Sequence, residues 1–121
     1  MTDQRQSDDG KEGIPCPFGD GGARNWKAWV NAMPGADAQL IVIGEVNAPQ
    51  GYTGRLRFGI ADKRKPPTQY LELNLVEEAG APDGWREIRA QGKALGREYA
   101  AVVILCHGDE LARITEVPVV E

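Results

Sequence analysis

At 121 residues the chain is long enough for one globular domain and too short for two ordinary ones. Its formal net charge of −4 argues against bulk nucleic-acid binding, and no apolar run approaches the roughly 20 residues that span a bilayer. No secretory signal opens the chain, so a cytoplasmic location is slightly favoured, although an exported chain whose leader has been removed would look the same.

Residues 1–24 differ in amino-acid composition from the rest of the chain. They are mostly polar residues and glycine, with few side chains able to bury surface and offset the entropy of ordering. We therefore expect a mobile N-terminal arm over residues 1–24, anchored at Cys16-Pro17-Phe18, with disorder over residues 1–13. The folded domain should then cover residues 25–121.

From Trp26 onward, apolar and polar residues alternate between turns built on Gly and Pro. A period of two places one set of side chains in a core and the other in water. We expect an all-β fold, a single seven-stranded antiparallel sandwich of the immunoglobulin-like type. The predicted strands are Trp26–Ala32, Leu40–Val46, Tyr52–Ile60, Gln69–Val76, Trp85–Ala90, Tyr99–Cys106 and Leu111–Val119.

Burial and turn chemistry refine this prediction. The second and sixth segments are apolar on both faces and should be interior strands. Pro118 removes a ladder donor from the seventh, which should lie at an edge or end early. Gly108-Asp109 fits a two-residue hairpin with glycine at its first central position. The residues expected in the core are Leu40, Val42, Leu56, Phe58, Leu71, Leu73, Val103 and Leu105.

Part of this pattern resembles a group of small uncharacterised bacterial proteins that share an NWxAWVNAMPG-like opening. The matching segments cover most of the predicted domain. The resemblance implies a compact β-sandwich and no activity. The segments that carry it are Asn25–Gly35, Leu40–Val46, Pro49–Tyr52 and Pro66–Leu75.

The residue types that support catalysis do not converge in the sequence. His107 is the only histidine, and its neighbour Cys106 should point to the opposite face of the strand, so the two do not form a nucleophile pair. No phosphate loop or nucleophile elbow is present. We therefore expect no enzyme activity, no metal and no cofactor. Cys16 and Cys106 are either joined in one disulfide or two reduced thiols, and the sequence leaves both states open.

A group of cations marks one candidate contact surface. Residues 55–97 hold nine basic and six acidic side chains within an acidic chain. Arg55 and Arg57 should share the polar face of the third strand, with Lys63, Arg64 and Lys65 in the loop beyond it. These residues form either a positive patch for an anionic partner or a solvated surface that protects a sheet edge.

Three aromatic residues are the other candidates for partner contact: Trp29, Tyr52 and Trp85. Trp26 and Trp29 should face opposite sides of a regular strand, so one needs a second surface, unless a bulge or the arm covers it.

Two classes of function remain from the sequence. The first is a binding domain that recognises a protein or an anionic partner through its end loops, of which an inhibitor of a secreted enzyme is one form. The second is a structural domain that associates with a second copy of itself.

Overall fold

The computed structural model describes residues 15–121, so the predicted disorder of residues 1–13 lies outside the described part of the chain. All regular elements in this range are β-strands. No helix among these residues is long and apolar enough to cross a membrane. The strands are β1 (Ala23–Asn31), β2 (Gln39–Ala48), β3 (Tyr52–Ala61), β4 (Thr68–Glu77), β5 (Gly84–Lys93), β6 (Ala101–Cys106), β7 (Asp109–Ile114) and β8 (Val119–Val120).

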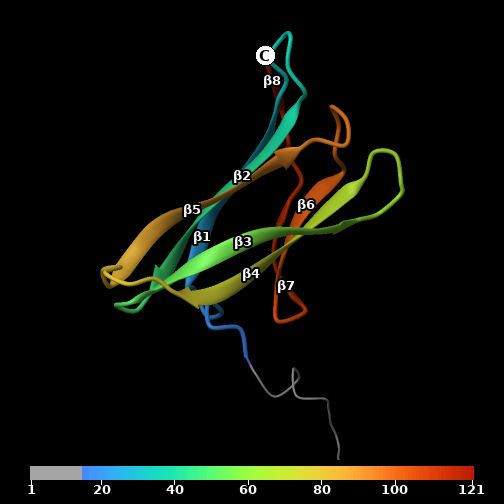
Figure 1. Ribbon diagram of the computed structural model, residues 1–121. Helices are drawn as coiled ribbons and strands as arrows, with labels where there is room; N and C mark the ends of the chain where they lie inside the picture. The colour runs from blue at the N-terminus through green and yellow to red at the C-terminus, as the bar shows by residue number, and fades with distance from the viewer. Residues whose placement is uncertain (1–14) are drawn as a thin grey trace, which may run out of the picture.

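The strands form two sheets of four that pack face to face (Figure 1). Sheet A has the order β5-β2-β1-β8 and sheet B the order β3-β4-β6-β7. The doubly apolar strands β2 and β6 are interior strands, as predicted. The predicted seventh strand is divided at residues 115–118 into β7 and β8, which lie at the edges of different sheets.

Two features of the predicted topology are wrong. The sheets are not wholly antiparallel, because β1 pairs parallel with β8 and β4 pairs parallel with β6. In an immunoglobulin sandwich the third and sixth strands are neighbours. Here β4 lies between β3 and β6, so the strand order departs from the immunoglobulin-like prediction. Pairings between strands far apart in the chain leave no local sequence signal.

The core lies between the sheets and contains most of the predicted residues. Leu40, Val42, Leu56, Leu71 and Leu73 are buried there, and Phe58 packs half-buried against them.

Of the two β6 residues expected in the core, Val103 is fully buried but lies outside the core cluster, and Leu105 is not fully buried. Val102, Ile104 and Cys106 face the core, whereas Val103 is buried on the outer face of the sheet and Leu105 is half-buried. A strand that is apolar on both faces has no alternation from which its parity can be read.

The hairpin after β6 also differs from the prediction. His107 and Gly108 both have positive φ, at 52° and 88°, so they are the central pair of the turn in place of Gly108-Asp109. Two positive φ values are the requirement of a type I′ turn, and His adopts this region more readily than most residues.

The segment that precedes β1 is attached to the domain at both ends. Cys16 is disulfide-bonded to Cys106, and Phe18 inserts its ring into the core, where only 1% of the residue is exposed. The Asn47 N–H donates to the Gly22 carbonyl at 2.9 Å. Strand β1 begins at Ala23, inside the range assigned from the sequence to the arm.

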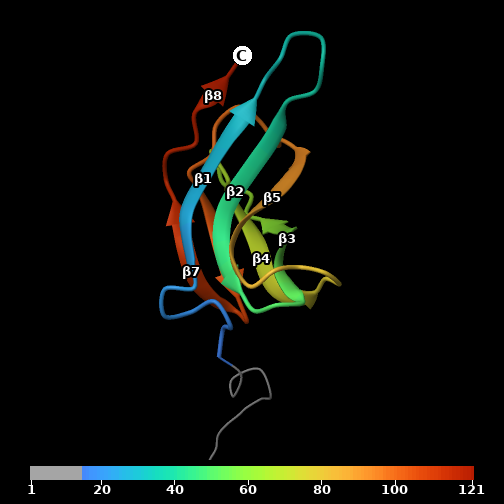
Figure 2. The ribbon, with the colours of Figure 1, turned by 90° about the vertical axis from the view of Figure 1, so that its left-hand side faces the viewer.

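The sandwich is closed on one side and open on the other. On the closed side β3 packs on β5, and the Phe58 ring lies 3.5 Å from where a Cβ on Gly92 would be. On the open side β1 and β7 run beside each other before the chain crosses to β8 (Figure 2). Because β8 pairs with only two residues of β1, the rest of β1 has no strand partner on this side.

Candidate binding groove

A groove of about 720 Å³ lies on the open side, between the edge of each sheet. Its walls are β1 and β7, and the crossover to β8 closes one end. The volume is within the range of ordinary ligand sites. Most of its lining side chains are apolar. The lining residues are Trp26, Lys27, Ala28, Trp29, Ala112, Arg113, Ile114, Thr115, Glu116, Pro118 and Val120.

A β-bulge in β1 shapes this wall. The register with β2 shifts between Arg24 and Lys27, and Asn25 takes a left-handed conformation with φ of 59°. Asn is one of the few residue types that tolerate this region. Trp26 lies on the inner side of the sheet, in alternation with Ala28 and Val30, and the extra residue allows Ala23, three positions earlier, to face the core as well.

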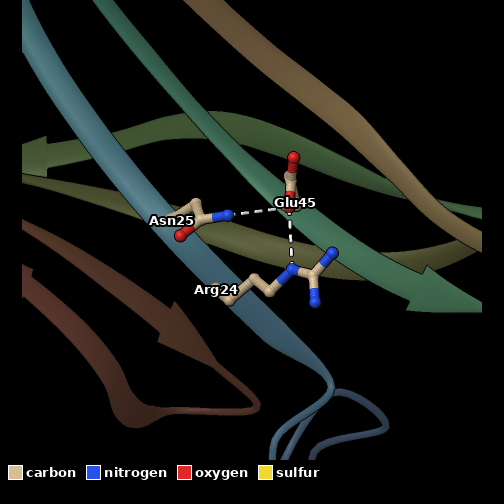
Figure 3. Close-up of polar contacts among 3 residues, drawn as sticks. All are labelled: Arg24, Asn25 and Glu45. Carbon is tan, nitrogen blue, oxygen red and sulfur yellow. Dashed lines mark hydrogen bonds and ion pairs between the residues drawn. The ribbon is translucent and has the colours of Figure 1, made fainter.

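Polar contacts of Glu45 with Arg24 and Asn25, on the outer face of sheet A, hold the bulge in place (Figure 3). The Glu45 carboxylate oxygen Oε1 accepts hydrogen bonds from Arg24 Nε at 2.8 Å and from Asn25 Nδ2 at 2.9 Å. Both hydrogen bonds lower the pKa of Glu45 below its ordinary value, and the bond from Arg24 has the larger effect. Arg24, which precedes the bulge, and Asn25, which lies within it, are thus both attached to the neighbouring strand.

Trp26 fits because the residue beneath it has no side chain. A Cβ on Gly44 would overlap three carbon atoms of the Trp26 ring, so the indole lies directly on the β2 backbone. Trp29 takes the opposite face and is half-buried next to Ile41. The two tryptophans therefore border the groove from the inner and outer sides of one strand.

The backbone of Ala28 lies between the two tryptophans; it is beside Val42 of β2 on one side and has no strand partner on the side that faces β8. Val30 N–H donates to the Pro118 carbonyl and Ala32 N–H to that of Val120, so these groups point toward β8. Hydrogen-bonding direction alternates along a strand, which directs the Ala28 N–H and C=O to the same side, into the groove below the end of β8. These groups form a short stretch of sheet edge without a strand partner. Ala28 as a whole is only 3% exposed, so neighbouring side chains cover this edge in the free protein.

Charged side chains stand at the groove rim. Glu110 binds Arg113 through two hydrogen bonds, of 3.1 Å from Nε and 2.8 Å from Nη2, which lower the pKa of Glu110 and raise that of Arg113. Lys27 and Glu116 are exposed. The groove thus presents an apolar floor and a rim with charges of both signs.

The aromatic residues singled out from the sequence do not come together. Trp29 lines the groove, whereas Tyr52 packs half-buried against the core at the start of β3. The Trp85 ring lies 3.7 Å below the Arg24 guanidinium on the outer face of sheet A, so the cation covers one face of this indole.

The predicted cations lie on a separate surface. Arg55 and Arg57 are exposed on the outer face of β3, opposite Asn74 and Glu72 of β4. The loop after β3 exposes Lys63, Arg64 and Lys65. Among the residues that the structure describes, none of these five cations has an ion-pair partner.

The groove itself was not predicted from the sequence. The available signal was Pro118, from which we expected the seventh strand to lie at an edge or end early. A strand that ends early leaves its neighbour without a partner, and this consequence for β1 was not predicted. Within residues 15–121 no group of three or more His, Cys, Asp or Glu side chains is placed to hold a metal ion.

Comparison with protein-family models, with curated proteins and with solved structures found no match for this chain.

Proposed function

We propose that the protein is a non-enzymatic binding module that takes up an extended polypeptide segment in the groove between β1 and β7. The observation that carries this proposal is the unpaired edge at Ala28, set between two tryptophans above an apolar floor. An added strand would pair with this edge through main-chain hydrogen bonds and place alternate side chains on the floor, which is the recognition mode called β-augmentation.

The other long edges of the two sheets support this choice of surface. Strand β3 carries Arg55 and Arg57, and β5 carries Arg86, Glu87 and Arg89. Charges along an edge discourage the addition of another strand. The open part of β1 has Lys27 as its only charge between two large aromatic side chains. Strand addition is therefore least opposed at β1.

The open edge limits the length and pattern of the bound segment. The four residues Trp26–Trp29 span about 13 Å at roughly 3.3 Å per residue, so about four residues can pair. Side chains directed inward would contact Trp26 and Ile114 and should be apolar. Those directed outward would lie near Lys27 and Trp29 and can be polar.

The proposal is tested with peptides selected on the full chain from a phage-displayed library of random linear peptides. Selected sequences should alternate apolar and polar residues. Trp29→Ser should weaken their binding at least tenfold, and the matched change Trp85→Ser, at a tryptophan outside the groove, should leave it unchanged. Equal loss in both variants, or selection of sequences without alternation, would refute the groove as the site.

Amide hydrogen exchange supplies a second, structural readout. In the free protein Ala28 N–H should exchange faster than Val30 N–H, which is bonded to Pro118. A selected peptide should slow exchange at Ala28. A concentration-dependent slowing without peptide, together with dimer formation in sedimentation, would instead assign the edge to a second copy of the chain.

A further inference from the structure

The end of the molecule beyond β3 presents an apolar side chain on a fixed backbone. The register between β3 and β4 shifts between Phe58 and Ala61, and the bulge projects Ile60, of which 78% is exposed. The buried amide of Gln69 donates to the carbonyls of Gly59 at 3.1 Å and Ile60 at 3.2 Å. A side chain that is only 5% exposed therefore fixes the bulge, so the exposure of Ile60 is built into the fold.

The β3–β4 loop follows, its two ends joined by hydrogen bonds, and it exposes three consecutive cations. Asp62 Oδ1 accepts the N–H groups of Thr68 at 2.9 Å and Arg64 at 3.3 Å, and Asp62 N–H donates to the Thr68 carbonyl. The only carboxylate of the loop is thus engaged with the backbone. Lys63, Arg64 and Lys65 are exposed, without ion pairs to other described residues.

The neighbouring loop adds to this surface. Ala100 N–H donates to the Pro67 carbonyl at 2.8 Å, which joins the β5–β6 loop to the β3–β4 loop. That loop carries Leu95, another of the most exposed large apolar side chains among the described residues. Both loops follow the ends of β3 and β5 that point to the same side of the molecule in Figure 1.

We propose that this end, formed by Ile60 and by Lys63, Arg64 and Lys65, docks on an anionic lipid bilayer. The three cations would lie among the anionic headgroups, and Ile60 would enter the interface beneath them. A basic cluster and an apolar insertion are each weak, and stable peripheral binding needs two such signals. An acidic protein would complement the cations, but an anionic layer with an apolar layer behind it complements the cations and Ile60 together.

The acidic balance of the whole chain does not oppose this docking. At physiological ionic strength charges are screened over about 8 Å, so carboxylates on the far parts of the domain contribute little at the loop. The lipid site is also separate from the groove between β1 and β7. Its success or failure is therefore independent of the proposed peptide binding.

The test is cosedimentation of the full chain with phosphatidylcholine vesicles that contain or lack phosphatidylserine. Binding should require phosphatidylserine and weaken steeply with salt. Each cation near the surface changes binding about fivefold, so Lys63→Ser, Arg64→Ser and Lys65→Ser together should reduce it about a hundredfold. The matched control replaces Lys27, Arg89 and Arg113 with Ser, which removes the same charge elsewhere and should have a much smaller effect.

Insertion of Ile60 is tested by its own variants. Ile60→Ser should weaken binding severalfold at every salt concentration and leave the salt dependence unchanged, and an Ile60→Trp reporter should shift its emission to the blue on vesicles. Equal effects of the two triple changes, equal binding to both vesicles, or an unshifted reporter would overturn the proposal. Salt-sensitive binding to polyglutamate without binding to vesicles would likewise overturn it in favour of an acidic protein partner.

Discussion

At the scale of single residues, one carboxylate oxygen joins two neighbours on the outer face of sheet A. Glu45 Oε1 accepts from Arg24 and Asn25, and the Arg24 guanidinium also lies over the Trp85 ring. The contacts are solvent-exposed, so each is weak. Their consequence is geometric, because they hold the left-handed Asn25 and with it the bulge that lets both Ala23 and Trp26 face the core.

The contribution of Glu45 and its hydrogen bonds to the free energy of unfolding should depend on pH. The pKa of Glu45 is depressed below 4.5 in the folded protein, so its contribution to stability is present at neutral pH and is lost as the pH falls through that lowered pKa. Glu45→Gln should therefore be less stable than the wild type at neutral pH, and the difference should shrink well below pH 4.5. Urea denaturation of both proteins across this range measures it. A difference that is constant with pH would mean that Glu45 contributes no charge-dependent contact.

Gly44 is the residue on which the inner tryptophan depends. Gly44→Ala would force the Trp26 ring off the β2 backbone, and overpacking of this kind costs about 1–3 kcal/mol. The near-ultraviolet circular dichroism of the tryptophans should change together with the free energy of unfolding. Gly96→Ala, at an exposed position with open space around it, is the control and should change neither. A stable Gly44→Ala variant with an unaltered tryptophan spectrum would contradict this packing.

At the scale of the strands, the sequence indicates where each strand lies along the chain but says little about which strands pair in the sheets. Alternation and turn residues located nearly every strand, and the doubly apolar segments correctly indicated the interior strands β2 and β6. The inward residues could not be assigned where alternation is absent, at Val103 and Leu105. The parallel pairing of β4 with β6 was not predictable either, since neither strand carries a local mark of its partner.

The candidate sites follow the same division. The cations of β3 and its loop were visible because a charge run is local. The bulge that exposes Ile60 depends on Gln69, which lies nine residues away, and the groove depends on where β8 stops. Both are consequences of pairing between segments, so they appear only once the strands are assembled.

Leu73 provides a test of the assigned inner face of β4. It is 1% exposed and its Cδ1 methyl group packs toward Gly54 of β3. Leu73→Ala should destabilise the domain by about 2–5 kcal/mol. The adjacent outward change Glu72→Ala should alter stability by a few tenths of a kcal/mol at most, as is usual for exposed positions. Similar losses in the two variants, measured by urea denaturation, would mean that the inner face had been misassigned.

At the scale of the whole molecule, the segment that precedes β1 belongs to neither sheet but is joined to the core of the sandwich. The disulfide between Cys16 and Cys106 joins residues 90 positions apart, and Phe18 fills part of the core beside it. Covalent closure of so long a loop restricts the unfolded chain, and its effect is greatest for long loops. The N-terminal segment and the interior strand β6 are thus stabilised as one unit.

Two truncations and one double substitution separate these contributions. Removing residues 1–13 should leave the melting temperature nearly unchanged, because the composition of that segment offers little surface to bury. Removing residues 1–22 should lower it strongly, because both Phe18 and the disulfide are lost. Cys16→Ser with Cys106→Ser retains Phe18 and isolates the covalent term, which should be about 4–5 kcal/mol for a loop of this length. If the short truncation lowers the melting temperature as much as the long one, residues 1–13 contribute to the folded core, and the N-terminal arm assigned from the sequence is wrong.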